Sequence, residues 1–149
     1  GLSAVVSTSA LQWFERPERF LARSADALDE GGVIAIATFG VENMREIGSL
    51  SGVRLHYPSC EQLRRMIPSA MTLVHFSEQI ITLTFGSARE VLTHLRQTGV
   101  SGIERPLGVT ATRRLIADYD AGYSDGKGGV TLTYHPIYIV ARKGTAERR

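Results

Sequence analysis

Residues 3–14 read SAVVSTSALQWF and residues 31–40 read GGVIAIATFG, two short apolar runs that each end in polar residues. A segment of helical length separates them. This order is typical of a strand–helix–strand unit in an open parallel sheet. Ligands of such sheets bind outside the carboxyl ends of the strands, so Ser7, Thr8, Ser9 and Thr38 are placed to contact one.

A glycine loop for a nucleotide is absent from this sequence. No G-x-G-x-x-G follows an apolar run anywhere in the chain. That motif lets the backbone approach a pyrophosphate at a helix N-terminus. A nucleotide cofactor would therefore need further contacts from outside these residues.

Composition is that of one ordinary globular domain. The chain has 149 residues, of which 43% are hydrophobic and 21% are charged. Its single cysteine, Cys60, cannot form an internal disulfide, and no apolar run approaches the length of a membrane span. With no secretory leader in the sequence, we expect a cytoplasmic protein without a membrane association. The net charge of +2 is dispersed, which argues against nucleic acid as a partner.

The rest of the chain alternates helical and extended patterns. Capping boxes at Ser59–Gln62 and Ser87–Glu90 predict two helix starts. Further helices are predicted from Pro17 to Gly31-Gly32, from after Gly40 to about Leu50, and from about Thr110. Extended segments are predicted at 33–39, at 71–85 as one strand or two, and at 130–141, with a turn at 125–129. This is an α/β layout.

Several motifs together resemble one family. They are Ala10-Leu11-Gln12-Trp13-Phe14, Ala37-Thr38-Phe39-Gly40, His56-Tyr57-Pro58, His94-Leu95-Arg96-Gln97-Thr98-Gly99, and Leu132-Thr133-Tyr134 with Ala141-Arg142-Lys143. On these motifs the chain resembles the malonyl-acyl-carrier-protein O-methyltransferases of biotin synthesis over nearly its whole length. Ser3 and Thr8 depart from that family, which usually has Asp and Asn there.

The resemblance implies a fold and a reaction. The fold would be the C-terminal half of a Rossmann-like class I methyltransferase sheet, as one partial domain over 1–149 with a helical cap inserted at about 87–122. The reaction would transfer a methyl group from S-adenosylmethionine to the free carboxylate of malonyl-acyl carrier protein. Such a carboxylate has a pKa of about 4 and is already ionised at neutral pH, so no catalytic base is expected.

The same resemblance implies site residues. Those expected to bind the cofactor lie at the end of the first strand and in the following turn: Ser7, Thr8, Ser9 and Gln12. Trp13, Thr38 and Phe39 would lie beside the acceptor. A carboxylate acceptor needs donors, for which Arg96, Arg113 and Tyr134 are the candidates. Arg105 and Arg114 are further arginines of the same segment.

Two other functions fit the sequence. The chain could be a methyltransferase acting on another small carboxylic acid, or a non-catalytic module that binds acyl carrier protein through its basic residues. Metal chemistry is not predicted, because the histidines and Cys60 show no ligand spacing and Asp118-Tyr119-Asp120 lacks the closing Glu of a calcium loop.

Completeness is a further expectation. A class I methyltransferase also binds its cofactor through a first strand and a glycine loop. We therefore expect this chain to be a fragment or one half of a split enzyme, inactive by itself. The strand at 4–7 would then be a sheet edge. That edge predicts a homodimer, or pairing with a missing N-terminal half.

Overall fold

The computed structural model describes residues 1–51, 56–98 and 108–145. They form two compact units. Unit 1 comprises Gly1–Val41, His56–Gln79 and His135–Arg149, and unit 2 comprises Glu42–Leu55 and Ile80–Tyr134. Among the described residues no helix is long and apolar enough to cross a membrane.

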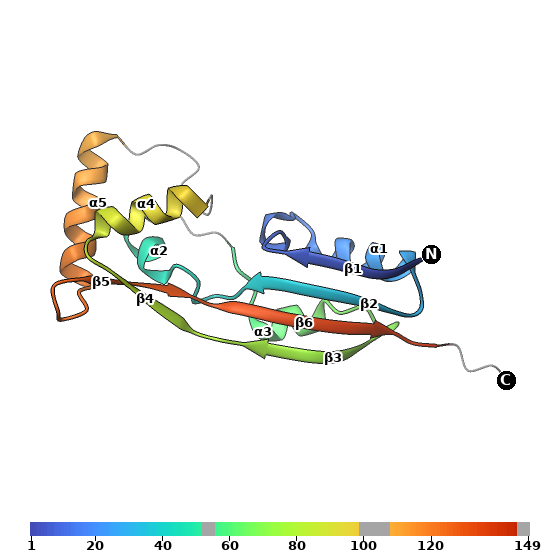
Figure 1. The fold of residues 1–149 in the computed structure, drawn as a ribbon. Coiled ribbons are helices and arrows are strands. Elements are labelled where there is room, and N and C mark those ends of the chain that lie inside the picture. Colours follow the sequence, from blue (N-terminus) through green and yellow to red (C-terminus); the bar gives the residue numbers. More distant parts are fainter. Residues whose placement is uncertain (52–55, 99–107, 146–149) are drawn as a thin grey trace. The chain divides into compact units, whose positions relative to one another are not determined.

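Unit 1 is built on a four-stranded sheet with the order β1-β2-β6-β3 (Figure 1). Its strands are β1 (Leu2–Thr8), β2 (Leu28–Phe39), β3 (Met71–Glu78) and β6 (Pro136–Lys143). The predicted parallel pair is confirmed, since β1 and β2 run in the same direction, whereas β6 is antiparallel to both β2 and β3. The helices of this unit are η1 (Leu11–Trp13), α1 (Pro17–Ala27) and α3 (Cys60–Arg65).

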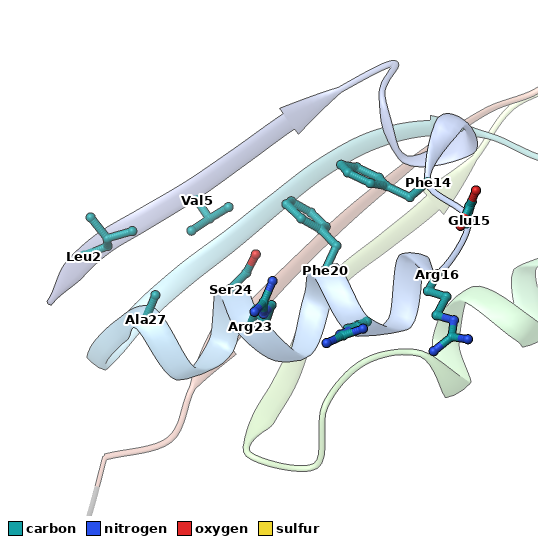
Figure 2. A pocket seen from close by; sticks show the side chains of 10 residues that line it. Leu2, Val5, Phe14, Glu15, Arg16, Phe20, Arg23, Ser24 and Ala27 are labelled. Carbon is teal, nitrogen blue, oxygen red and sulfur yellow. The ribbon is translucent and has the colours of Figure 1, made fainter.

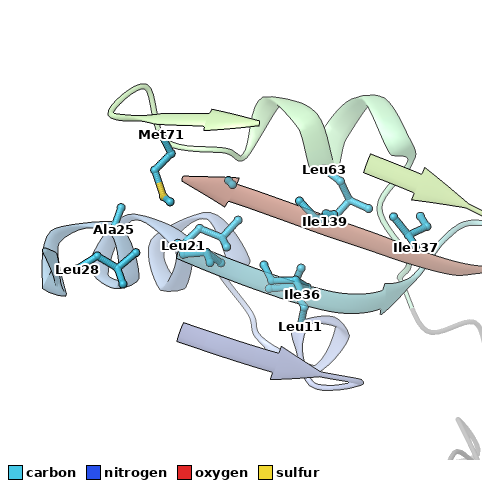
Figure 3. Close-up of a cluster of buried hydrophobic side chains, with 11 residues drawn as sticks. Leu11, Leu21, Ala25, Leu28, Ile36, Leu63, Met71, Ile137 and Ile139 are labelled. Atoms are coloured by element: carbon cyan, nitrogen blue, oxygen red, sulfur yellow. The ribbon is translucent and has the colours of Figure 1, made fainter. Parts of the chain in front are cut away.

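The core of unit 1 lies between the sheet and its helices (Figure 3). Alternate residues of β2 are buried, and Ile34 and Ile36 face Leu21 of α1 and Leu63 of α3 in one apolar cluster. Each such side chain contributes about 1.5–3 kcal/mol when fully buried. The alternate buried residues of β2 and the apolar sides of α1 and α3 therefore meet on the same face of the sheet.

A groove also opens between β1 and α1 (Figure 2). Apolar side chains such as Leu2, Val5 and Phe20 line one part of it. The rings of Phe14 and Phe20 stack there with centroids 4.7 Å apart. Arg16 and Arg23 border the groove as well, so it is apolar with a cationic rim.

The described residues of unit 2 form two strands and three helices. They are β4 (Ile81–Phe85), β5 (Val130–Tyr134), α2 (Arg45–Ser51), α4 (Ala88–Thr98) and α5 (Val109–Gly122). The Asp120 carboxylate accepts a hydrogen bond of 3.0 Å from the backbone N–H of Ala88, which joins α5 to the start of α4. Tyr119 of α5 is buried and donates to the carbonyl of Thr131 at 2.7 Å. Burial raises the pKa of Tyr119 well above its ordinary value.

Local signals in the sequence predicted several of these elements correctly. The capping box at Ser59 and Gln62 is complete at the start of α3. At the start of α4 only half of the predicted box forms, because the Glu90 carboxylate accepts from the backbone N–H of Gly86 instead of Ser87. The segment 71–85 forms two strands, β3 and β4.

Two predicted boundaries were wrong. The helix expected to reach Gly31-Gly32 ends at Ala27, and β2 already begins at Leu28, whose side chain joins the core. The register with β1 shifts between Leu28 and Val33, and Gly31 accommodates the irregularity with a φ of 75°.

The strand expected over 130–141 is likewise two strands. β5 pairs with β4 in one sheet, while β6 pairs with β2 and β3 in the other, and His135 lies between them. A single pattern of strand-forming residues therefore serves two different sheets, because the pairing partners change at this residue. Gly102, Pro106 and Gly108 predict a loop at 100–109, which lies largely outside the described residues, as does Arg105.

The buried carboxylate of Glu46 holds α2 to β5. Glu46 is 1% exposed. Its carboxylate accepts a hydrogen bond of 2.6 Å from the Thr133 hydroxyl and one of 3.1 Å from the Thr133 backbone N–H. Arg45 Nε lies 3.9 Å from the same carboxylate. Glu46 is thus the hydrogen-bond acceptor for two donors that are buried from solvent.

We predict that Glu46→Ala lowers the free energy of unfolding by at least about 2 kcal/mol, because it leaves two buried donors without an acceptor. Urea denaturation of the chain measures this change. Asp118→Ala is the matched control in the same unit, since it removes an exposed carboxylate 3.6 Å from Arg114 and should cost less than about 1 kcal/mol. Equal losses in the two variants would contradict this role for Glu46.

Candidate functional site

The carboxyl ends of β1 and β2 meet at one edge of the sheet in unit 1. The backbone N–H of Ser9, just after β1, donates to the carbonyl of Ala37 in β2 at 2.8 Å. Ser9 has a φ of 51°, a left-handed conformation that few residues other than glycine adopt. This turn ends the strand and directs the chain into η1. Such backbone strain is typical of functional sites.

Gln12 joins the two strand ends. Its side-chain amide donates to the carbonyl of Ser9 at 2.7 Å, and its Oε1 accepts from the Thr38 hydroxyl at 3.4 Å. Thr38 is 3% exposed and Gln12 is half-buried. The structure therefore brings together three of the residues that the sequence selected: Ser9, Gln12 and Thr38.

The other predicted site residues near these strand ends differ in exposure. Ser7 pairs with Ile36 and is half-buried, whereas Thr8 pairs with Ala37 and is exposed. Trp13 is 54% exposed, so its indole is not a core anchor. Phe39 packs edge-to-face against Tyr57, with ring centroids 6.4 Å apart. Trp13 therefore presents an aromatic surface to solvent just after the strand-end turn.

The remaining selected residues lie in unit 2. Tyr134, the last residue of β5, is bonded through its hydroxyl to Nε2 of His94 at 2.9 Å. Burial raises the pKa of Tyr134, so the phenol stays protonated at neutral pH. Arg96 is exposed on α4 and donates to the carbonyl of Leu92, and Arg113 is exposed on α5.

A second cluster, which sequence spacing did not reveal, is formed by Cys60, Glu78 and His135 of unit 1. Glu78 Oε2 lies 2.8 Å from His135 Nε2 and accepts a hydrogen bond of 3.0 Å from the Cys60 thiol. Burial and this hydrogen bond raise the pKa of Cys60 to about 11. The hydrogen bonds from Cys60 and His135 lower the pKa of Glu78. These three residues lie far apart in the sequence, so no spacing motif could have predicted them.

Comparison with curated proteins finds relatives over nearly the whole chain. A malonyl-[acyl-carrier protein] O-methyltransferase of Bacteroides fragilis is 43% identical over 96% of the chain and 29% of its own length. Those of Bacteroides helcogenes and Haemophilus influenzae are 39% and 32% identical, over 95% and 97% of the chain. The chain spans 53% and 56% of these two relatives. No family model matches the chain.

Solved structures confirm the predicted fold class. A protein of Bacillus halodurans assigned to the methyltransferases aligns over 96% of this chain and 70% of its own, with a TM-score of 0.64 and 13% identity. The YcgJ protein of a Bacillus species aligns over 98% of this chain and 65% of its own, with a TM-score of 0.61 and 9% identity. These likenesses establish a Rossmann-like methyltransferase fold. Over nearly its whole length the chain is thus related in sequence to malonyl-[acyl-carrier protein] O-methyltransferases, as its motifs predicted.

Proposed function

We propose that this chain is part of an enzyme that transfers a methyl group from S-adenosylmethionine to the free carboxylate of malonyl-acyl carrier protein, in the cytoplasm. The observation that carries the proposal is the sequence relationship, 32–43% identity over 95–97% of the chain, to three enzymes of that name. The chain spans 29%, 53% and 56% of the length of these three relatives, so the activity is assigned to a larger protein of which these residues would form a part.

The strand-end residues fit the polar part of S-adenosylmethionine. Ser9 and Gln12 place hydroxyl and carboxamide groups at the carboxyl ends of the parallel pair β1 and β2, where ligands of such strands bind, and Thr38, beside the acceptor, bonds Gln12. These groups both donate and accept hydrogen bonds, which suits a ligand that carries an ammonium and a carboxylate. Ser7 and Thr8, the last two residues of β1, would add further contacts. When bound, S-adenosylmethionine supplies an electrophilic methyl group.

The contribution of this chain to catalysis would be orientation and exclusion of water. The acceptor carboxylate, with a pKa of about 4, is ionised at neutral pH, so no residue has to remove a proton. Holding its oxygen in line with the methyl group can contribute about 7–11 kcal/mol. Trp13 and Phe39 would form walls beside the acceptor. No described residue is assigned a proton-transfer role in this scheme.

We predict that S-adenosylhomocysteine binds the chain weakly but saturably, and that Thr38→Val weakens this binding about 5-fold because it removes the hydrogen bond that holds the Gln12 side chain. Isothermal titration calorimetry measures both. Thr72→Val is the matched control, since Thr72 is exposed on β3 and its loss should leave binding unchanged. Equal effects of the two substitutions would contradict a cofactor site at the strand ends.

The acceptor carboxylate would be held by Arg96, Arg113 and Tyr134. An arginine side chain offers two parallel donors that match a carboxylate, and the Tyr134 phenol remains protonated to act as a further donor. Both arginines are exposed on helices of unit 2.

Malonyl-acyl carrier protein is predicted to bind the chain more tightly than its methyl ester, because the ester lacks the charge that the arginines pair with. Arg96→Gln or Arg113→Gln should reduce this difference, whereas Arg89→Gln on the same helix as Arg96 should not. Fluorescence anisotropy with labelled carrier protein measures the affinities. Equal affinity for acid and ester, with strong salt dependence, would favour the non-catalytic binding module. Preference for free malonate or aconitate would favour a small-acid methyltransferase.

We also propose that β1 pairs with a second chain. β1 lies at the edge of the described sheet, and its Leu2 and Val6 are 50% and 70% exposed. An edge strand presents unpaired backbone N–H and C=O groups, which are a template for pairing. The partner would be another copy of this chain or an N-terminal half of the same enzyme.

Analytical ultracentrifugation is expected to show a concentration-dependent dimer of the chain. Val6→Lys should shift the equilibrium to the monomer, because a charge on an edge strand opposes pairing. Val74→Lys places the same charge on β3, the other edge strand of the sheet, where Val74 is 57% exposed, and it should leave the dimer unchanged if the chains pair through β1. A strictly monomeric chain at all concentrations would contradict the homodimer.

A further inference from the structure

The fold brings a thiol, a carboxylate and an imidazole together at one end of the sheet in unit 1. Cys60, Glu78 and His135 each offer one ligand atom, and the three atoms lie within 4.8 Å of one another. We infer that these residues form a binding site for a divalent transition-metal ion, with zinc as the best match. The inference stands independently of the proposed methyl transfer, because it uses none of the strand-end residues.

The distances are close to those of a zinc site. Glu78 Oε2 lies 3.0 Å from Cys60 Sγ and 2.8 Å from His135 Nε2. In a tetrahedral zinc site, ligand atoms at about 2.0–2.3 Å from the ion lie about 3.3–3.8 Å from one another. Small side-chain rotations would open this space, without a change of backbone.

The backbone around the three residues is well held. Cys60 is the first residue of α3, whose start is set by the capping box of Ser59. Glu78 is the last residue of β3, and His135 directly precedes β6. The backbone N–H of Gly40 donates to the carbonyl of His135 at 2.9 Å.

The imidazole ring of His135 is also closely packed. A Cβ atom on Gly40 would lie only 2.6 Å from Cε1 of the His135 ring, so this glycine lets the ring pack against the end of β2. His135 is 4% exposed. The ligand that costs most to reorient is therefore already positioned.

The donor set suits zinc. Thiolate, imidazole and carboxylate are the three kinds of side chain that bind zinc in proteins, and three of them leave a fourth position for water. The Glu78 side chain is 52% exposed, which provides a path for the ion from solvent. On binding, the Cys60 thiol would release its proton to solvent. The Nε2–H of His135, which donates to Glu78, would also lose its proton to solvent, with Nδ1 protonated in the bound neutral ring, so that the Nε2 lone pair binds the ion.

One neighbouring charge opposes the ion. The Arg64 guanidinium stacks 3.8 Å from the centroid of the Phe76 ring and interacts electrostatically with both Cys60 and Glu78. A cation at this position repels a second cation. Removal of the Arg64 charge should therefore strengthen metal binding, which a purely structural hydrogen-bond network would not show.

The test is a titration of the untagged chain with Zn²⁺, followed by calorimetry, and with Co²⁺, followed by absorption. We expect one Zn²⁺ per chain and a thiolate-to-cobalt charge-transfer band in the near ultraviolet. Cys60→Ser and Glu78→Gln should each weaken zinc binding at least ~10-fold, and Cys60→Ser should abolish the cobalt band. Arg64→Leu should tighten binding about 3-fold.

His75→Asn is the matched control, because His75 is exposed on β3, the strand that also carries Glu78, and bonds Ser77 instead of the cluster. It should leave zinc binding unchanged. His135→Asn removes the buried ligand, and Cys60→Ser and Glu78→Gln keep the test decisive if that variant does not fold. Zinc should also raise the thermal unfolding midpoint of the unmodified chain but not that of Cys60→Ser. Absence of zinc binding, or binding that survives Cys60→Ser and Glu78→Gln, would overturn the inference.

Discussion

The parallel pairing of β1 with β2 is the constraint on which the candidate site depends. Two strands that run in the same direction end at the same edge of a sheet, so their terminal polar residues become neighbours. The hydrogen bond from Ser9 to Ala37 continues the ladder one residue past β1. The left-handed φ of Ser9 then turns the chain into η1, and Gln12 bonds both strand ends.

β6 provides the second organising interaction of unit 1. It pairs with β2 on one side and β3 on the other, and its buried residues, among them Ile137 and Ile139, complete the core. The same pairing carries His135 to the end of β3, where Glu78 lies. The cluster with Cys60 is therefore a consequence of sheet register, and it shares no side chain with the hydrogen bonds that Gln12 makes at the ends of β1 and β2.

Unit 2 has a smaller described sheet than unit 1, and buried polar contacts contribute to its stability. Its two-stranded sheet cannot bury much surface, and two strands alone are marginally stable in water. Buried polar contacts supplement the apolar ones: Glu46 accepts two hydrogen bonds from Thr133, and Tyr119 donates to Thr131. The donor groups proposed for the acceptor lie on α4, α5 and β5. These contacts join α2 and α5 to β5, and the hydrogen bond from Ala88 to Asp120 joins α4 to α5.

Local pattern in the sequence determined much of this molecule. Alternating or continuous apolar runs predicted β1 and β2, the Ser59–Gln62 box predicted α3, and the rule for the ends of parallel strands predicted that Ser9 and Thr38 lie near one another. These features depend on residues close in sequence or on a general rule for parallel sheets. Only the tertiary structure decided that helix α1 stops before Leu28, that residues 130–141 serve two sheets, and that Cys60, Glu78 and His135 meet. The reason is physical: strand register and core packing join residues that are distant in sequence, and no local propensity encodes which distant partner is chosen.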